Sequence, residues 1–272
     1  MNVSKLRILV IGAHQDDPEK MAGTAIKFVR AGHIVKFLCA TNGQSGHEVY
    51  PGYKIVQIRD EEKRRSKEVL GVAGYESLDM NDGYLTTDIP SRERMMRAIR
   101  EFAPDLIFTH RPCDYHPDHR NTAMLVQDCS YLLRVPNFLP TVPVMDKLPL
   151  IFYIDDTFQK PYSFQAGVIV AIDDVFEKKI EALAQHESQV FDWLPWVDGT
   201  DSASIPKDAR ERMEWLAKRY EPASLWQAEK FAGLLKARYG KKAADIRLCE
   251  AFEPCEYGAK HSGVDYELIF PK

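Results

Sequence analysis

Residues 6–31, LRILVIGAHQDDPEKMAGTAIKFVRA, contain the pattern that decides the fold of this chain. The apolar run at residues 8–11 is typical of a strand buried in a parallel sheet. The pattern after it indicates an amphipathic helix whose core-facing side chains are Met21, Ile26, Phe28 and Val29. Pro18 suits the first position of that helix, with Asp17 as its cap. The polar residues between strand and helix therefore lie where open α/β sheets bind ligands.

The cluster of His14, Asp16 and Asp17 at this point has three explanations. In the first, Asp17 caps the helix and the other two side chains are solvated. The second is a phosphate site, which is disfavoured because the segment has no glycine-rich or Walker motif and two carboxylates repel an anion. The third is a metal site, since His14 and Asp17 are close enough in the chain to bind one ion and leave Asp16 free.

A second cluster favours the metal site. Residues 105–109 (DLIFT) are predicted to form a strand, and a helix is predicted over residues 121–133. Between them, HRPCDYHPDHR at residues 110–120 holds three histidines and two aspartates, namely His110, His116, His119, Asp114 and Asp118. Such a density of ligand types at a second strand end is hard to explain as a solvated loop. We expect both clusters to meet at one edge of the sheet.

Composition excludes several classes of protein. The chain has 272 residues, and its net charge of −4 gives no electrostatic reason to expect a nucleic-acid partner. No apolar stretch approaches the ~20 residues of a membrane span. The start of the chain lacks a cleavage-site pattern and is better used as the first strand. Five cysteines without a CxxC pair favour a reducing compartment, so we expect a cytoplasmic location.

Strands and helices alternate along the chain. Strands are predicted at residues 34–40, 105–109, 150–154 and 167–172, and helices at residues 58–70, 92–102, 121–133 and 173–190. This alternation predicts a Rossmann-like three-layer α/β sandwich with a mostly parallel sheet. Residues 1–190 would form this catalytic core. Residues 191–272 would form a C-terminal extension of helices and short strands within the same single domain, residues 1–272.

Three further segments besides the two clusters could contribute to a site. The turn at residues 41–47 (TNGQSGH) either lets the backbone approach a ligand or is a flexible loop. The four prolines of residues 135–149 predict a long ordered loop, a kind of segment that often covers a site. FDWLPW at residues 191–196 is a core plug or, as the second interpretation, a platform for substrate or a contact with a partner.

The two clusters together resemble the motifs of the PIG-L/LmbE-like family of zinc-dependent N-deacetylases. The family motif AHPDDxE is matched by residues 13–19, with Gln15 in place of proline, and HPDH is matched without change by residues 116–119. The Thr41-Asn42-Gly43 turn, Arg59 with Glu62, and residues 184–189 also resemble family segments. The resemblance covers roughly the first 190 residues.

The resemblance implies a role for each matched residue. The zinc ligands would be His14, Asp17 and His119. Asp16 would be the general base, and His116 the acid or oxyanion stabiliser, with Asp118 orienting its ring. Substrate contacts would come from Arg59, Asn42 and Gly43. His110 and Asp114 would contact and orient the zinc ligands without binding the metal themselves.

The expected activity is therefore zinc-dependent removal of acetyl from an N-acetylated amino sugar of the N-acetylglucosaminyl type. Zinc lowers the pKa of a bound water from ~15.7 to about 7, which makes it a nucleophile at neutral pH. Two alternatives stay open: a zinc amidase acting on a non-sugar amide, and a sugar-binding relative without turnover. The ligand set also suits Fe²⁺. The partner would be a small amino-sugar substrate, and the sequence leaves a homo-oligomer open.

Overall fold

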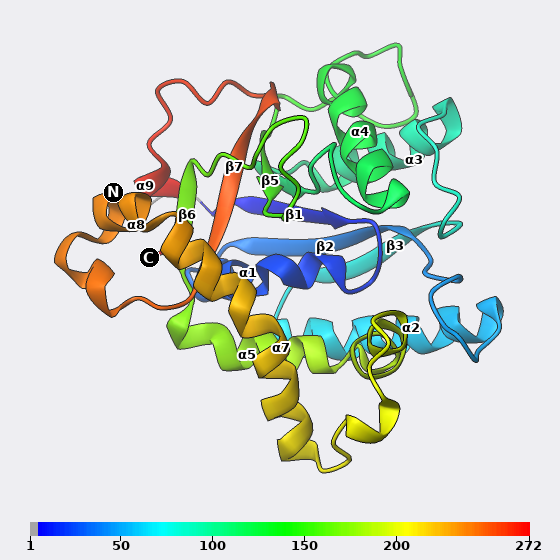
Figure 1. Ribbon diagram of the computed structural model, residues 1–272. Coiled ribbons are helices and arrows are strands. Elements are labelled where there is room, and N and C mark those ends of the chain that lie inside the picture. The colour runs from blue at the N-terminus through cyan, green and yellow to red at the C-terminus, as the bar shows by residue number, and fades with distance from the viewer. Residues whose placement is uncertain (1–4) are drawn as a thin grey trace.

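The computed structural model describes residues 5–272, which form one seven-stranded sheet with helices on both faces (Figure 1). The first five strands in spatial order run parallel, and the sixth is antiparallel to both of its neighbours. In that order the strands are β3 (Gly74–Met80), β2 (Ile34–Thr41), β1 (Arg7–Gly12), β4 (Leu106–Thr109), β5 (Leu150–Ile154), β7 (Cys249–Gly258) and β6 (Val168–Ala171).

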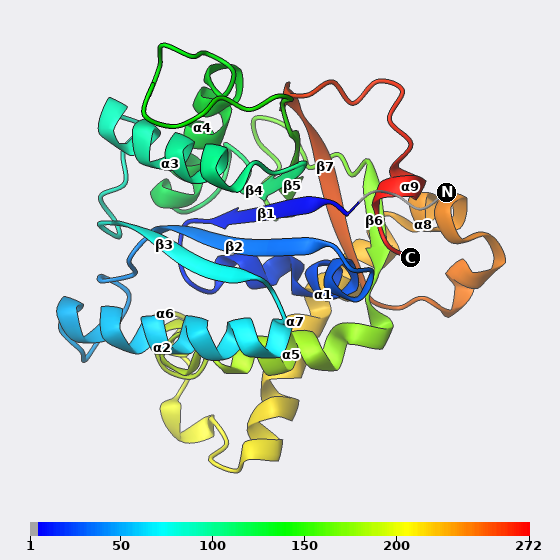
Figure 2. The same ribbon diagram turned by 180° about the vertical axis from the view of Figure 1, so that it is seen from behind.

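The helices form two outer layers (Figures 1 and 2). One face carries α1 (Ala22–Arg30), α2 (Gly52–Leu70), α5 (Phe176–Ala184) and α7 (Ala209–Lys230), and the other carries α3 (Ile89–Phe102) and α4 (Pro117–Leu132). Short helices complete the described chain: η1 (Asp17–Met21), η2 (Asp173–Val175), η3 (Ser188–Trp193), α6 (Leu194–Val197), η4 (Ser202–Ser204), α8 (Ala232–Tyr239), η5 (Gly240–Asp245) and α9 (Tyr266–Ile269). The predicted three-layer α/β sandwich is confirmed.

The core explains why β1 is apolar on both faces. Ile8 and Val10 pack with Phe28 of α1 on one side of the sheet, whereas Leu9 and Ile11 pack against α3 and α4 on the other. Successive side chains of a strand point to opposite faces, so a strand covered by helices on both sides needs an unbroken apolar run. Within residues 5–272, no helix has the length and apolar character needed to cross a bilayer.

The strand order creates a switch point beside β1. The chain builds β2 and β3 on one side of β1 and then crosses to place β4 on the other, with Ile11 opposite Thr109. The loops that leave β1 and β4 therefore diverge, and a crevice forms at their carboxyl ends. This topology brings residues 13–17 and residues 110–119 together, as the sequence predicts.

Several element boundaries differ from the prediction. α2 begins at Gly52, before the predicted start at residue 58. The C-terminal extension contains α7, a helix of 22 residues that continues through Pro222. The tail forms β7, a ten-residue strand between β5 and β6, in place of separate short pieces. β7 therefore lies within the sheet that residues 1–190 begin.

The proline-rich segment at residues 135–149 is an ordered loop without helix or strand, as predicted. It folds around the buried guanidinium of Arg100 on α3. That group donates hydrogen bonds to the carbonyl oxygens of Leu132, Val135, Phe138, Leu139 and Val142. The loop contributes no lining residue to the cavity described below, so it does not serve as a lid in this structure.

Candidate metal centre

Three ligand atoms converge at the switch point. Nδ1 of His14 lies 3.2 Å from Nε2 of His119, and Oδ2 of Asp17 lies 3.3 Å from each of them. Tetrahedral ligands at about 2.0–2.2 Å from zinc are separated by about 3.3–3.6 Å, so this triangle fits such an ion. All three side chains are buried. The structure thus brings together the three residues that the sequence predicts as zinc ligands.

Asp17 is oriented by the backbone of its own loop. Its Oδ2 accepts hydrogen bonds from the N–H groups of His14 at 2.7 Å and Ala13 at 3.1 Å. The predicted helix cap is therefore wrong, since the carboxylate turns back towards the strand end and the helix starts as a 3₁₀ turn. Burial alone raises the pKa of Asp17, but the charges of His119 and His110 outweigh it and hold the pKa well below its ordinary value. The group is a carboxylate at neutral pH.

Carboxylates also orient the two histidines. Nε2 of His14 lies 3.1 Å from Asp82 and 3.6 Å from Asp118, while Nδ1 of His119 lies 3.0 Å from Asp114. A carboxylate on one ring nitrogen fixes the ring and leaves the other nitrogen free to bind a metal. Burial lowers the pKa of His14, but hydrogen bonds to Asp118, Asp17 and Asp82 raise it well above the ordinary value on balance.

His110 contacts both Asp17 and His119 of the cluster. Its Nε2 lies 3.0 Å from the backbone nitrogen of Ala13 and 3.2 Å from Oδ2 of Asp17. Its ring stacks on that of His119, with the centroids 4.0 Å apart. Burial and the charge of His119 lower the pKa of His110 to about 4, so the ring is neutral at pH 7. A neutral ring can pack against His119 without repelling a bound cation.

His116 caps α4 and faces the cluster. Its Nδ1 accepts a hydrogen bond from the backbone N–H of Asp118 at 3.2 Å, which leaves Nε2 to carry the proton of the neutral ring. The Asp118 carboxylate accepts from the N–H groups of Gly83 and Leu85. Asp118 thus orients His116 through its backbone, in place of the carboxylate contact that the sequence suggests, because the N-cap position of a helix faces backbone donors.

A cavity of about 240 Å³ opens beside these side chains. His14 and His116 reach it from the metal cluster. The residues that line it are His14, Ser45, Gly46, Arg59, Asp82, Gly83, Tyr115, His116, Gln189, Trp193 and Leu194. Asp16, the predicted general base, is partly exposed next to Asp17, and its carboxylate has no hydrogen-bond partner within residues 5–272.

Arg59 is the one predicted substrate contact that lines this cavity. Its guanidinium is buried and donates to the carbonyl of Gly46 at 2.7 Å and to the side-chain oxygen of Gln189. A third, longer contact of 3.4 Å joins it to Oε1 of Gln15, the residue that replaces the proline of the family motif. Among the described residues, no carboxylate lies within ion-pair distance of Arg59, so its charge is available to a ligand.

Asn42 and Gly43 shape the loop that surrounds Arg59. The Asn42 side chain contacts Asp79 and the backbone of Gln44. Gly43 has φ +71°, and a Cβ there would lie 2.3 Å from Oε1 of Gln15 and 2.5 Å from Nη1 of Arg59. Only glycine therefore fits at residue 43, because a side chain would displace the guanidinium.

A buried network beneath the metal loop also joins distant segments. Glu19 is fully buried and accepts hydrogen bonds from Ser66 at 2.6 Å and Tyr75 at 2.7 Å. Nε2 of His186 lies 2.7 Å from Glu19, and the charge of Glu19 raises the pKa of His186 against the effect of burial. Glu19 and His186 belong to family-like segments, and nothing in the sequence alone indicated that they pair. The hydrogen bonds of Glu19 hold η1, and hence Asp17, against Ser66 of α2, Tyr75 of β3 and His186, which follows α5.

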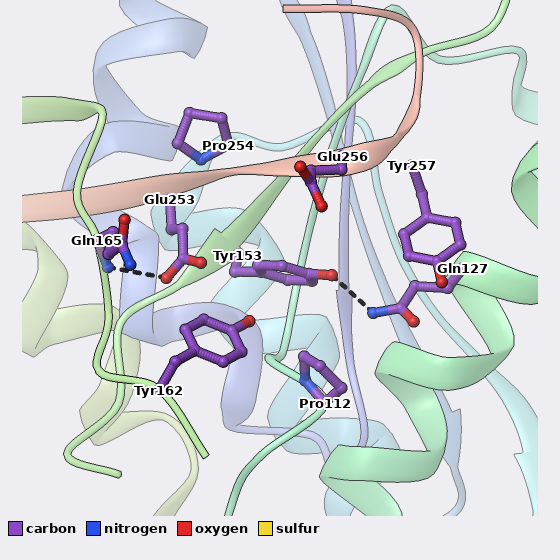
Figure 3. Close-up of a pocket in the computed structure, with 9 residues that line it drawn as sticks. All are labelled: Pro112, Gln127, Tyr153, Tyr162, Gln165, Glu253, Pro254, Glu256 and Tyr257. Atoms are coloured by element: carbon purple, nitrogen blue, oxygen red, sulfur yellow. Dashed lines mark hydrogen bonds between the residues drawn. The ribbon is translucent and has the colours of Figure 1, made fainter. Parts of the chain in front are cut away.

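A larger cavity of about 630 Å³ lies elsewhere at this edge of the sheet (Figure 3). Figure 3 shows Gln165 bonded to Glu253 and Tyr153 bonded to Gln127. The lining residues are Pro112, Gln127, Tyr153, Tyr162, Gln165, Glu253, Pro254, Glu256 and Tyr257. None of them belongs to a group of metal-ligating side chains, so the hydrolytic chemistry is expected in the smaller cavity.

Asp82 carried no sequence signal, and Ser45 and Gly46 carried only a general one. Asp82 contacts His14 from the end of β3, where no motif marks it. Ser45 and Gly46 lie in the predicted glycine turn, but only the fold shows that they line the cavity.

Known proteins resemble this chain in sequence and structure. The model of the PIG-L family, described as GlcNAc-PI de-N-acetylase, matches residues 9–130. Diacetylchitobiose deacetylase of Thermococcus kodakarensis is 31% identical over 199 residues, covering 67% of this chain and 70% of that protein. A probable N-acetyl-alpha-D-glucosaminyl L-malate deacetylase 2 of Bacillus anthracis is 25% identical over 194 residues, covering 67% and 80%.

A solved structure extends the similarity beyond the matched motifs. N,N'-diacetylchitobiose deacetylase from Pyrococcus horikoshii superposes with a TM-score of 0.70 and 25% identity, covering 93% of this chain and 84% of that one. The sequence match, the fold and the converging motif residues agree with one another. The chain therefore belongs to the PIG-L/LmbE-like family of N-deacetylases.

Proposed function

We propose that this protein is a zinc-dependent hydrolase that removes the acetyl group from an N-acetylated amino sugar. His14, Asp17 and His119 would hold the metal. The observation that carries the proposal is the triangle of three ligand atoms, 3.2–3.3 Å apart, beside a cavity that His14 and His116 line. Three protein ligands leave a coordination position open, as a catalytic zinc site requires.

A divalent cation bound there would acidify a water molecule and polarise the acetyl carbonyl. Asp16 is the general base that takes the proton from the attacking water, because it is the carboxylate next to the ligands that no protein group occupies. His116 donates a hydrogen bond from Nε2 to the oxyanion of the tetrahedral intermediate, since its Nδ1 is engaged with the backbone of Asp118.

Arg59 and Asp118 position the reaction. Arg59 binds a hydroxyl of the sugar, which its location in the cavity wall and its lack of a carboxylate partner support. The Asp118 carboxylate is buried, accepts from two backbone N–H groups and lies 3.6 Å from Nε2 of His14. The backbone N–H of Asp118 donates to Nδ1 of His116. Asn42 and Gly43 stabilise the conformation of the loop that surrounds Arg59.

Two alternatives differ in their chemistry. A deacylase for a non-sugar amide would use the same residues but would not need Arg59 to bind a hydroxyl. A sugar-binding relative without turnover would not need Asp16 and His116, and the presence of both argues against it. The ligand set also suits Fe²⁺. The five cysteines are all unpaired and buried, which supports a reducing, cytoplasmic location.

The test combines metal content with acetate release. The protein is purified, its metal is quantified, and acetate is measured with N-acetylglucosamine, N,N'-diacetylchitobiose, an N-acetylglucosaminyl malate and an N-acetylated amino acid. One zinc per chain and acetate release from a sugar are expected. Release from the amino acid alone would favour the amidase. Stoichiometric zinc without release from any of them would favour the binding protein.

A further inference from the structure

Two tryptophans form a continuous aromatic surface from the cavity to the outside. Trp193, at the end of η3, lines the metal cavity, and its ring stacks on Trp196 of α6 with centroids 5.2 Å apart and planes at 17°. Trp196 is 57% exposed. Phe191 alone of this segment's aromatic residues joins the core. The core-plug interpretation therefore holds for Phe191, and the tryptophan plate, Trp193 and Trp196, needs another explanation.

The plate is attached to the same side chains that build the cavity. Ser188, at the start of η3, donates to Glu62 of α2 through its N–H at 2.7 Å and its hydroxyl at 2.8 Å. Gln189 accepts from Arg59. Glu62 and Arg59 thus hold the π-helical turn that carries Trp193. Turns of this kind occur frequently at functional sites. The indole rings have a defined position relative to the metal cluster.

The cavity is too small for more than part of an extended substrate. Its volume of about 240 Å³ falls below the range of about 300–1,000 Å³ that is usual for sites enclosing a whole small ligand. An acetylated sugar ring that reaches His116 would fill it. Any unit attached to that ring must leave the cavity, whose lining includes the 65%-exposed Tyr115 and Trp193, on which the exposed Trp196 stacks.

The chemistry of the mouth favours a neutral unit. The exposed Asp192, which precedes Trp193 in the chain, and Glu48 lie 3.9 Å and 3.3 Å from the ring nitrogens of His47. Two arginines near this segment are occupied, since Arg212 stacks over Phe191 and Arg219 pairs with Asp198. Arg59, whose charge is available, is buried in the wall of the cavity itself. A carboxylate on the attached unit would be repelled by those of Glu48 and Asp192. A flat indole face instead covers the C–H face of a pyranose and leaves its equatorial hydroxyls in water.

We infer that the tryptophan plate is a subsite for a second, neutral pyranose joined to the acetylated ring. The substrate is then an N-acetylated oligosaccharide, in contrast to a sugar carrying an acidic aglycone. This inference rests on the proposed deacetylase function. It assigns Trp193 and Trp196 to substrate selection, with no part in the reaction itself.

The experiment compares Trp193→Ala, Trp196→Ala and Trp196→Phe with Trp226→Ala. Trp226 is a matched control, because it is 36% exposed on α7 and does not line the cavity. With N,N'-diacetylchitobiose, Trp196→Ala is expected to raise KM about tenfold and leave kcat near that of the wild type. This is the effect of losing an interaction that is equally strong in the ground state and in the transition state. The preference for the disaccharide over N-acetylglucosamine should fall by the same factor. Trp196→Phe should retain part of it, and Trp226→Ala all of it.

A binding measurement separates this inference from the proposed function. Calorimetric titration of the zinc-loaded protein in an Asp16→Asn background reports affinity without turnover. A disaccharide that binds about tenfold more tightly than the monosaccharide, with the difference lost in Trp196→Ala, supports the subsite even if no acetate is released. Equal affinities for both sugars, or tighter binding of an N-acetylglucosaminyl malate, overturn it. A wild-type oligomer that Trp196→Ala dissociates also overturns it, because the plate would then be covered by a second copy.

Discussion

Asp16 and Asp17 are neighbours in the chain, yet they have different surroundings. Asp17 is buried and accepts two backbone hydrogen bonds, which aim Oδ2 at the two histidines. Asp16 is partly exposed and occupies the cap position of η1 without using its side chain there. One carboxylate is therefore fixed by the backbone, and the other has no hydrogen-bond partner among the described residues.

The amide substitutions Asp16→Asn and Asp17→Asn test this difference. Asp16→Asn should retain zinc and lower kcat by about 10²–10⁴, because an amide cannot accept the proton of the attacking water. Asp17→Asn should weaken zinc binding, and excess zinc should restore part of its activity. Metal content and kcat at saturating zinc are measured for both. Rescue of Asp16→Asn by zinc would mean that the two roles are reversed.

Asp155, at the carboxyl end of β5, provides a test of stability against pH. Its Oδ1 has no hydrogen-bond partner among the described residues. Burial raises the pKa to about 7, and the nearby charge of Asp156 adds to that effect. A carboxyl whose folded pKa lies above its unfolded value of about 3.9 destabilises the protein as the pH rises between the two values, and the full penalty is present above the higher one.

Asp155→Asn should therefore increase the free energy of unfolding at pH 8, on the order of 2 kcal/mol, and change it little at pH 4. Urea denaturation of variant and wild type at both pH values measures the difference. The neighbouring Asp156→Asn is the control. Burial raises the pKa of Asp156 too, but Asp156→Asn should destabilise the protein, because it removes the carboxylate that accepts from the fully buried Arg111 at 2.7 Å and leaves that guanidinium without its closest ion pair. An Asp155→Asn gain at pH 4 equal to that at pH 8 would contradict the assignment.

The meeting of the two clusters could be predicted because each is local in sequence and follows a recognisable strand, and parallel strand ends meet at one edge. The choice of His14, Asp17 and His119 as ligands within those clusters came from the family resemblance. Asp82 could not be found this way, because it follows β3, whose mixed polar and apolar residues gave no clear pattern. The resemblance assigned the Asp118 carboxylate to His116, whereas the backbone N–H groups that donate to it, those of Gly83 and Leu85, lie in another loop.

At the scale of elements, Arg100 is a single side chain that organises a whole loop. It is 4% exposed and donates five hydrogen bonds to carbonyl oxygens within residues 132–142. Four prolines in residues 135–149 prevent that loop from using helix or sheet hydrogen bonds. The guanidinium supplies the donors that the backbone there lacks.

Arg100→Met preserves much of the side-chain volume and removes the donors. Because buried carbonyl groups left without partners cost about 1–3 kcal/mol each, we expect a loss of at least about 2 kcal/mol in the free energy of unfolding. kcat/KM should stay near the wild-type value below the unfolding temperature, since the loop does not line the cavity. Arg97→Met is the control, as Arg97 is exposed and reaches the same loop only through Thr141. A selective loss of activity in Arg100→Met would show that the loop acts on the site.

The elements that the sequence predicted least well are those that depend on distant partners. α7 continues through Pro222 because tertiary packing of Leu216 and Ala228 on the rest of the molecule compensates for one missing backbone donor. β7 was read as short pieces, since the alternation along residues 249–258 becomes a strand only when β5 and β6 bond to its two edges.

At the scale of the whole molecule, the three ligands join segments that are far apart in the chain. His14 and Asp17 belong to the loop after β1 and to η1, and His119 belongs to α4 on the other face. An ion that binds them in the folded state alone stabilises that state by mass action, by about 2.7 kcal/mol at a concentration 100 times its Kd. For a chain of this size, that corresponds to a rise in Tm of roughly 5–10 °C.

Calorimetry of the zinc-loaded and chelator-treated wild type should show this rise in Tm. Asp17→Asn should lose most of it, whereas Asp155→Asn, outside the ligand set, should show the same zinc-dependent increment as the wild type. The three-layer architecture itself needs no metal, because its helices and strands follow from the apolar patterns of β1, β2 and β4 and from the helices between them. Chelation should therefore lower Tm without unfolding the protein at 25 °C. A Tm that is insensitive to chelation would contradict a structural link through the metal.

The position of β7 has a consequence for how a newly made chain acquires its sheet. During synthesis β5 and β6 emerge first, and each must wait for residues 249–258 before the edge that faces the other is paired. Until the ribosome has delivered that strand, the nascent sheet has two open edges that can pair with another chain. A ribosome that stalls between residues 172 and 248 therefore presents an aggregation hazard, and chaperones that shield strand edges should be engaged throughout that interval.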